Sequence, residues 1–306
     1  MKFRCGVVVV VGRPNVGKST LINAIVEKKV SIVSPRPQTT RKLVLAVANV
    51  HGAQIIFRDT PGIHKPRSKL EKALVDKALQ TLHEADVILF VVDVSKLPNE
   101  EDKRIASLLR EIKDVPIVVA LNKMDRLRPE YVYSHYTAYE ELMKTKGKKP
   151  PEMMYTNALT GENVDKLVKL LVDHLPERKP LYPSTDFYTD QTLREMAEEI
   201  IREKVLSNIR EEIPYSVAVK IENWEEDFTS AGEPLTRIEA VIFVGREAHK
   251  PILIGDKGQM IKKIGTAARL ELEKLLRTRV YLGLHVKVKE KWIEKPHSWK
   301  ELGILS

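Results

Sequence analysis

A glycine-rich stretch near the start of the sequence has residue types and spacing suited to binding phosphate. The run GRPNVGKS fits the pattern G-x-x-x-x-G-K-[S/T] and lies between an apolar run and an amphipathic stretch. In such a loop, backbone N–H groups turn inward around phosphate oxygens, and the N-terminus of the following helix adds favourable partial charge. We expect Lys18 to neutralise the β- and γ-phosphates and the Ser19 hydroxyl to bind Mg²⁺. The nucleotide-binding residues predicted in this loop are Gly12, Asn15, Val16, Gly17, Lys18, Ser19 and Thr20.

The motif NKMD indicates which base the nucleotide carries. Asn122, Lys123 and Asp125 follow an apolar run of strand type, at the sheet edge where ligands bind in α/β proteins. The Asp125 carboxylate can accept hydrogen bonds from N1–H and the exocyclic amine of guanine, a donor pair that adenine lacks. We expect Lys123 to lay its aliphatic stem over the base while its ammonium group reaches back to the first loop. The backbone N–H of Ala158, in TNALTG, is predicted to meet guanine O6.

Two further motifs are predicted to surround the phosphates. In DTPG we expect Asp59 to hold Mg²⁺ through a water molecule and the backbone N–H of Gly62 to sense a γ-phosphate. In PQTTRK, residues 37–42, we assign Thr40 as the metal ligand, with Thr39 as the neighbouring alternative. Both segments should order with a nucleoside triphosphate and relax after hydrolysis. The predicted metal set is Ser19, Thr40 and Asp59, and the predicted catalytic set is Lys18, Thr40, Gly62 and Asn15.

Four motifs in this order have a joint specificity that none has alone, and residues 5–172 resemble the translation-factor-related GTPases. The resemblance implies binding of GTP and GDP and slow GTP hydrolysis. Ile63 follows DTPG where small signalling GTPases carry a water-orienting glutamine, so the chain resembles the branch with a hydrophobic residue there. In some relatives with an asparagine matching Asn15, a potassium ion fills the place of an arginine finger. Two roles for Asn15 stay open: a potassium ligand, or a residue that only shapes the loop.

The elements that must hold these motifs alternate along the first half of the chain. Short apolar runs are separated by amphipathic helical stretches, among them residues 19–29, 72–85 and 162–175. This alternation is typical of an α/β fold with a doubly wound sheet and helices on both faces. The predicted strands, mostly buried on both faces, are 7–11, 53–57, 86–93, 116–122 and 153–158.

The domain organisation follows from length and from a change in composition. A chain of 306 residues is longer than one typical core, so two domains are expected. Residues 176–185 contain three prolines, which suits a stiff, extended linker. We therefore predict a GTP-binding domain over residues 1–175, this linker, and a second, C-terminal domain over residues 186–306.

The C-terminal half contains a second glycine loop, within ILIGDKGQMIKKIG at residues 252–265. Gln259 and Met260 follow its second glycine, where a nucleotide loop needs lysine and a hydroxyl residue, so the pattern argues against a second nucleotide site. A plain turn between helices is one alternative. The surrounding order of helix–strand–strand–helix–GxxG–helix–strand resembles a K-homology RNA-binding domain of the bacterial, type II topology. The resemblance implies that residues 186–306 form a smaller α+β RNA-binding domain with its core at about residues 200–288.

In the K-homology family the GxxG loop clamps the backbone of single-stranded RNA, and about four bases lie along a neighbouring apolar groove. Gly255 and Gly258 lack side chains where the sugar-phosphate chain must approach, and we expect Asp256 to point away from it. For four isoleucines, a place in the groove and a place in the core stay open; they are Ile252, Ile254, Ile261 and Ile264. The predicted RNA-binding residues are Ile254, Gly255, Asp256, Lys257, Gly258, Ile261, Lys262 and Lys263.

Positive charge is concentrated toward the C-terminal end. The chain carries 51 Lys and Arg against 42 Asp and Glu, a net charge of +9, and residues 250–306 alone hold 13 basic and 6 acidic side chains. A basic segment of this kind indicates a polyanionic partner, either nucleic acid or an anionic membrane face. Cys5 is the only cysteine, so no intramolecular disulfide can form and the reducing cytosol is expected. No run reaches the ~20 apolar residues needed to span a bilayer.

The motifs DTPGIHKP and PQTTR, together with the K-homology pattern, resemble one family over nearly the whole chain: the Era family of bacterial ribosome-assembly GTPases. The resemblance implies binding to the 3′ end of 16S ribosomal RNA and a role in assembly and maturation of the 30S subunit. It also implies a monomeric, cytoplasmic protein with peripheral contact at the inner face of the cell membrane. One departure is Asn157, where the family usually has serine before this alanine. Because the predicted guanine contact uses backbone, only the fine affinity for guanine is affected.

Two other functions are compatible with the sequence. One is an RNA chaperone with a structural nucleotide site, which Mg²⁺-dependent phosphate release would distinguish from a GTPase. The other is a membrane-associated GTPase, for which the sequence offers no amphipathic insertion helix. The leading prediction is a GTP-hydrolysing switch that binds ribosomal RNA.

Overall fold

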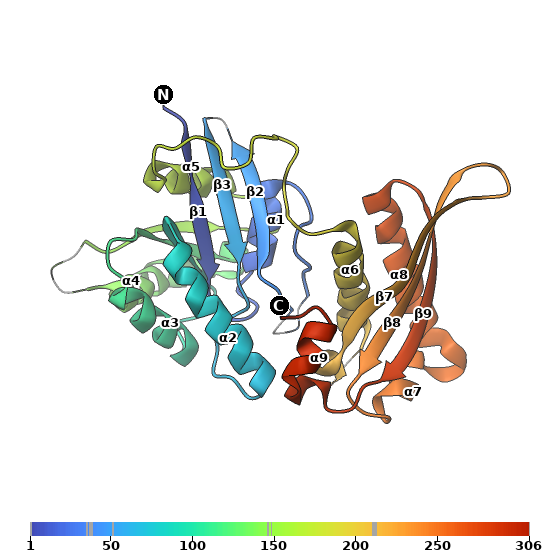
Figure 1. Ribbon diagram of the computed structural model, residues 1–306. Helices are drawn as coiled ribbons and strands as arrows, with labels where there is room; N and C mark the ends of the chain where they lie inside the picture. The colour runs from blue at the N-terminus through green and yellow to red at the C-terminus, as the bar shows by residue number, and fades with distance from the viewer. Residues whose placement is uncertain are drawn as a thin grey trace. The chain divides into compact units, whose positions relative to one another are not determined.

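The chain divides into two units, drawn in Figure 1. The computed structural model describes residues 2–34, 36, 39–50, 52–145, 147, 149–209 and 213–305. The first unit comprises the chain up to Asp190, apart from two short segments, 34–39 and 68–70, which group with the second unit. The second unit otherwise begins at Gln191. Pro37 and Gln38 of the predicted mobile segment lie outside the described residues.

The first unit is built on a six-stranded sheet. Its strands are β1 (Arg4–Val11), β2 (Val44–Val50), β3 (Ala53–Asp59), β4 (Val87–Asp93), β5 (Ile117–Asn122) and β6 (Glu152–Thr156). Their order is β2-β3-β1-β4-β5-β6, and all neighbours are parallel except β2 and β3, which are antiparallel. The strand β2 was not predicted from the sequence, because two alanines and one asparagine, which are poor strand formers, interrupt its three valines.

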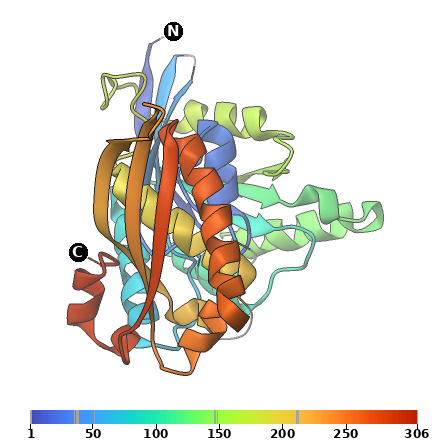
Figure 2. The same ribbon diagram turned by 90° about the vertical axis from the view of Figure 1, so that its right-hand side faces the viewer.

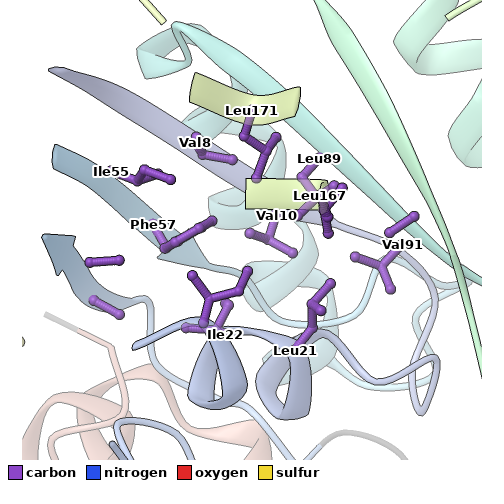
Figure 3. Packing of buried hydrophobic residues seen from close by; sticks show 14 of the residues in the cluster. Val8, Val10, Leu21, Ile22, Ile55, Phe57, Leu89, Val91, Leu167 and Leu171 are labelled. Carbon is purple, nitrogen blue, oxygen red and sulfur yellow. The ribbon is translucent and has the colours of Figure 1, made fainter. Parts of the chain in front are cut away.

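Helices cover both faces of this sheet, and the central strand β1 shows how the two cores separate. Val8 and Val10 point into one core, with α1 (Lys18–Val26) and α5 (Val164–His174), as Figure 3 shows. Val9 and Val11 belong to the other core, which is closed by three helices. These are α2 (Lys69–Thr81), α3 (Glu100–Glu111) and α4 (Val132–Met143). Because successive side chains of a strand point to opposite faces, one run of valines serves both cores.

The segment after α5 lies along the edge strand β2 and completes the first unit. The backbone N–H of Val47 donates to Tyr188 O at 2.9 Å. The buried Gln54 side chain accepts a hydrogen bond from the backbone N–H of Tyr182 at 3.0 Å and donates to its carbonyl at 2.8 Å. The predicted linker, residues 176–185, is therefore held against the first unit, and the exposed edge of the sheet is covered.

The second unit combines a three-stranded sheet with helices on one face. Its elements are α6 (Leu193–Asn208), β7 (Ala218–Phe228), β8 (Pro234–Val244), α7 (His249–Ile254), α8 (Gln259–Leu276) and β9 (Arg279–Val288). In the sheet β7 is antiparallel to β8 and β9 is parallel to it, and Figure 2 shows α6 and α8 on the same face. Apolar side chains from both helices and the sheet form one core. Among the described residues of either unit, no helix is both long and apolar enough to cross a membrane.

The chain beyond β9 packs back onto the second unit, although the predicted K-homology core ends at about residue 288. Trp292 is fully buried, and its indole N–H donates to Ser216 O at 2.9 Å. The short helix α9 (Pro296–Glu301) follows, and the Trp299 indole N–H donates to Trp292 O at 3.0 Å. Buried indoles with satisfied N–H groups fix this segment in place.

Candidate nucleotide and RNA sites

Lys18 is buried inside the phosphate loop, residues 12–19. Only 6% of Lys18 is exposed, and its Nζ donates to the carbonyls of Gly12 and Arg13, each at 3.1 Å. Burial lowers the pKa of Lys18 to about 8, against the opposing attraction of the Asp59 carboxylate. A buried ammonium group held by neutral carbonyls gains a stronger partner when an anionic phosphate oxygen arrives.

Two residues from the end of β5 hold the middle of this loop. Lys123 Nζ donates to Asn15 O at 2.5 Å, and Asn122 Nδ2 donates to Val16 O at 2.8 Å. Gly17 has a φ of 102°, and a Cβ there would lie 2.3 Å from Asn122 Nδ2, so both conformation and contact require glycine. With these carbonyls occupied, the backbone N–H groups of the loop and of the first turn of α1 are left to face an anion.

The other predicted nucleotide contacts in the loop differ in exposure. The Val16 side chain is fully buried in the core, so only its backbone is available to a ligand. Thr20 is half-buried in the first turn of α1. Asn15 is exposed and has a left-handed φ of 64°. The loop therefore offers mainly backbone groups, together with Lys18 and Ser19.

Three oxygen-bearing side chains meet beside the phosphate loop, and they are the predicted metal set. Ser19 Oγ donates to Asp59 Oδ2 at 2.7 Å and lies 3.0 Å from Thr40 Oγ1. Asp59 is fully buried, and its Oδ1 has no hydrogen-bond partner among the described residues. Burial raises the pKa of Asp59, although Lys18 opposes the shift. Two hydroxyls and an under-satisfied carboxylate fit Mg²⁺, which takes few protein oxygens and completes its shell with phosphate and water.

Thr39 and Thr40, the two threonines considered as metal ligands, differ in their contacts. Thr40 Oγ1 lies near Ser19, as described above. Thr39 Oγ1 instead donates to Arg36 O at 2.7 Å, a contact within the segment 34–39. The geometry therefore favours Thr40 as the ligand.

The DTPG segment lies directly against the phosphate loop. A Cβ on Gly62 would come within 2.8 Å of Pro14 N, so the absence of a side chain permits this approach. The backbone N–H of Ile63 donates to Gly12 O at 3.1 Å, while the Ile63 side chain is only 1% exposed. A buried isoleucine cannot orient a water molecule, so hydrolysis must rely on other groups. The next residue, His64, contacts Gly62 O through Nδ1 at 2.8 Å.

The predicted guanine contacts come from the ends of β5 and β6. The Asp125 side chain is 35% exposed and thus open to a base. The backbone N–H of Ala158 donates to Asn122 Oδ1 at 3.1 Å, so Asn122 joins this loop to the phosphate loop. Asn157 Oδ1 accepts the N–H of Leu159 at 3.0 Å. The asparagine that replaces the usual serine therefore shapes the turn that presents Ala158.

Asp93, at the end of β4, belongs to the site but was not predicted. Its Oδ2 accepts a hydrogen bond from Lys123 Nζ at 2.8 Å, and its Oδ1 accepts one from Ser95 Oγ at 2.5 Å. Burial alone would raise the pKa of Asp93, but these hydrogen bonds outweigh it and the pKa is lowered. The available signal was an acidic residue at the end of a buried strand, at the sheet edge where Asn122 also lies.

The second glycine loop makes a sharp turn between α7 and α8. Gly255 and Gly258 have φ values of 74° and 79°, and Lys257 between them has a φ of 47°. A Cβ on Gly255 would lie 2.8 Å from Met260 N, whereas one on Gly258 would meet nothing within 4 Å. Since α8 begins at Gln259, the loop lies at a helix N-terminus, where free backbone N–H groups attract anions.

The charged side chains around this loop face solvent. Lys257, Lys262 and Lys263 are exposed, and none of them takes part in an ion pair within the described part of the chain. Asp256 is exposed as well. The three ammonium groups are therefore available to phosphates that approach the start of α8.

The four isoleucines divide between core and surface. Ile264 is fully buried in the core of the second unit, which excludes it from a groove. Ile254 and Ile261 are half-buried, and Ile252 is 47% exposed. Three of the four can thus meet a base, and one cannot.

Comparisons with known proteins match the two glycine loops to two known domains. A family model described as 50S ribosome-binding GTPase matches residues 7–123, and a KH domain model matches residues 212–293. GTPase Era of Halothermothrix orenii is 44% identical over 303 residues, 99% of each chain. GTPase Era of Geobacter metallireducens is 43% identical over 301 residues, 98% of each chain. This chain belongs to the Era GTPase family.

Two solved Era structures are similar over the whole chain. Each has a TM-score of 0.91 and 42% identity, and covers 99% of this chain and 100% of its own. One is Era in complex with MgGDPNP and nucleotides 1506–1542 of 16S ribosomal RNA. The other is an Aquifex aeolicus Era variant bound to GDP and AlF4⁻. The predicted fold class, an α/β P-loop GTPase domain followed by a KH domain, is confirmed.

Proposed function

We propose that this Era-family protein binds GTP and GDP with Mg²⁺ at the phosphate loop and hydrolyses GTP. The observation that carries the proposal is the convergence of Ser19, Thr40 and Asp59 around a buried carboxylate oxygen that lacks a partner among the described residues. Ser19 and Thr40 supply hydroxyl ligands for the metal, and Asp59 holds it through water. The Lys18 ammonium group keeps its two carbonyl acceptors and donates its third N–H to a phosphate oxygen, and bound Mg²⁺ would neutralise the charge that develops there.

Guanine is selected by side chains that are already positioned beside the phosphate loop. Asp125 accepts the two donors of the base edge, and the Lys123 stem covers its face. The backbone N–H of Ala158 turns from Asn122 Oδ1 to guanine O6. Gly62 senses the γ-phosphate through its N–H, whereas the Ile63 side chain has no polar group that could orient the attacking water. Turnover of the isolated protein is therefore slow.

Asn15 extends this proposal to a monovalent cation. Its carbonyl is held by Lys123, and its side chain is exposed at the mouth of the loop. We assign it to a K⁺ ion that supplies positive charge during hydrolysis, as an arginine finger does elsewhere. Equal hydrolysis rates in potassium and sodium buffers would contradict this assignment and leave Asn15 with a purely structural role.

The GxxG loop and the start of α8 are proposed to bind single-stranded RNA. Exposed lysines and a helix N-terminus take the phosphates, and Ile254 and Ile261 offer an apolar surface to the bases. Because a similar Era structure contains nucleotides 1506–1542 of 16S ribosomal RNA, we propose the 3′ end of that RNA as the ligand. We further propose that the protein acts in assembly and maturation of the 30S subunit, as a monomer in the cytoplasm.

The positive charge of the C-terminal segment also supports peripheral contact with an anionic membrane surface, since 13 basic residues lie in residues 250–306. Sedimentation with anionic vesicles, with and without competing RNA, tests this part of the proposal. Vesicle binding that RNA abolishes would place both ligands on one surface. No sedimentation at low salt would rule out membrane contact.

The experiment that tests the main proposal has two arms. The first measures Mg²⁺-dependent phosphate release from GTP; its absence would leave an RNA chaperone with a structural nucleotide site. The second titrates an oligonucleotide matching the 3′ end of 16S ribosomal RNA, at fixed salt, with GDP or a non-hydrolysable GTP analogue bound. Tighter binding with the analogue would identify a switch with reciprocal coupling. Equal, tight binding would mean that RNA binding does not depend on the bound nucleotide. No binding in either state would refute the RNA assignment.

A further inference from the structure

The phosphate loop carries one charged side chain that none of the proposed nucleotide contacts uses. Arg13 Nε donates to Asp102 Oδ2 at 3.1 Å. The Arg13 side chain is only 13% exposed and that of Asp102 is 0% exposed, so the pair lies out of solvent. The two residues are 89 positions apart, and the contact therefore joins the loop after β1 to the start of α3.

Asp102 is held in place by the helix on which it stands. It forms a capping box with Asn99: the Asn99 backbone N–H donates to Asp102 Oδ2 at 3.2 Å, and the Asp102 N–H donates to Asn99 Oδ1 at 3.0 Å. The carboxylate thus lies in the first turn of α3, where the helix dipole favours negative charge. Its position is set without Arg13, so it can serve as an anchor for the loop.

A buried ion pair of this kind is a poor source of stability, because the cost of removing two charges from water offsets their attraction. Its geometric effect is more direct. The carbonyl of Arg13 is one of the two that accept a hydrogen bond from Lys18 Nζ. Anchoring the Arg13 side chain restricts the rotation of that peptide, and with it the placement of Lys18 and the neighbouring N–H groups.

We propose that Arg13 and Asp102 are positioning residues for the GTPase reaction, through which α3 holds the phosphate loop in its phosphate-binding conformation. Neither side chain contacts the nucleotide; both act through Lys18 and the loop backbone. The inference rests on the proposed function, since it requires that the loop bind GTP.

The test compares full-length variants by their Kd for GDP with Mg²⁺ and by kcat and KM for GTP. Asp102→Asn keeps an acceptor for Asn99 but removes the charge, and Arg13→Met removes the guanidinium while keeping length. Each should raise Kd and KM about tenfold, the effect expected from losing one charge-assisted contact. The double variant should have a Kd and a KM no higher than those of the more impaired single variant, because both substitutions remove the same interaction. Arg13→Lys, which keeps the charge, should stay within about threefold.

The control breaks another ion pair of the same unit. Arg178 Nη2 lies 3.3 Å from Asp86 Oδ1, just before β4 begins and therefore at the sheet edge opposite the phosphate loop. Arg178→Gln should leave the Kd for GDP within about twofold of the unaltered protein, as expected for a partly exposed pair.

Thermal unfolding with and without GDP separates positioning from packing. Positioning predicts a smaller GDP-induced rise in Tm even in the double variant, which has no unpaired buried charge. If the variants have a lower Tm but keep the full GDP-induced rise in Tm and an unchanged Kd for GDP, the Arg13–Asp102 pair contributes only to packing and the proposal is overturned. If the unaltered protein itself fails to bind GDP, the proposed function falls and this inference falls with it.

Discussion

Both glycine loops of this protein precede a helix, yet they hold their cationic side chains in opposite ways. Lys18 is 6% exposed, and its ammonium group already has two carbonyl acceptors. Lys257 and Lys262 are exposed, and neither forms an ion pair within the described residues. The first loop is a closed site with its donors in position, and the second is an open cationic surface.

The difference corresponds to the ligands that the loops are suited to bind. A nucleotide has fixed dimensions, so buried donors can be positioned in advance and act in a medium of low dielectric constant. An RNA strand repeats its phosphates but varies its bases. Exposed lysines on flexible stems follow such a strand, at the cost of being screened by salt.

Replacing Lys18 with alanine should have the largest effect. GTP hydrolysis should fall by at least about 100-fold, as when a single preorganised donor is removed from an active site. RNA affinity, measured by fluorescence anisotropy on the nucleotide-free protein at fixed salt, should change by less than about twofold. Lys257→Ala is the matched control and should show the reverse pattern. If Lys18→Ala lost both GTP hydrolysis and RNA affinity, the two loops would not act as separate sites.

Replacing Asp125 with asparagine should have the next largest effect, and it should change only the recognition of the base. The amide keeps an acceptor for N1–H but turns a donor toward the guanine amine, so GTP affinity should fall by about 100-fold or more. Xanthosine nucleotides, with a carbonyl in place of the amine, should gain affinity. Competition binding with both nucleotides measures the change. Equal losses for both bases would mean that Asp125 supports the loop and does not read the base.

Removing the three lysines of the second loop should weaken RNA binding in a salt-dependent way. In the Lys257→Ala, Lys262→Ala, Lys263→Ala variant, the slope of log K against log salt should become less steep by about two units, at about 0.7 per single-strand phosphate contact. Titrations at four salt concentrations give the slope. An unchanged slope would show that these lysines do not contact phosphate, and GTP hydrolysis serves as the control for folding.

The smallest expected effect is a difference in the free energy of unfolding between alanine variants of the two glycines in the second loop. Gly255→Ala meets both a left-handed φ and the Met260 backbone, and should lower the free energy of unfolding by about 2–3 kcal/mol. At Gly258 an added Cβ would contact nothing within 4 Å, so Gly258→Ala should lower the free energy of unfolding only through its left-handed φ, by about 1 kcal/mol. Urea denaturation of the full chain measures both. Equal losses would indicate that the loop relaxes away from Met260.

The sequence motifs predicted several of the contacts that the fold makes around the first loop. Spacing alone placed Lys18 and Ser19 at a helix start, and the expected reach of Lys123 back to the first loop is seen as its 2.5 Å hydrogen bond to Asn15 O. The fold class was also predictable, because buried strands and amphipathic helices alternate. The strand β2 was not predicted, because two alanines and one asparagine interrupt its valines, and residues 176–185 were predicted as a linker although they hydrogen-bond to Gln54.

Sequence by itself determined the local features on which the proposed chemistry of both loops depends, because glycine spacing, a lysine–serine pair and an NKMD run act through local backbone geometry. Tertiary structure alone decided which charges support that chemistry. Asp93 meets Lys123 across 30 residues, and Asp102 meets Arg13 across 89. Such pairs depend on how β1, β4, β5 and α3 pack, and no local pattern encodes the distance between residues that far apart in the chain.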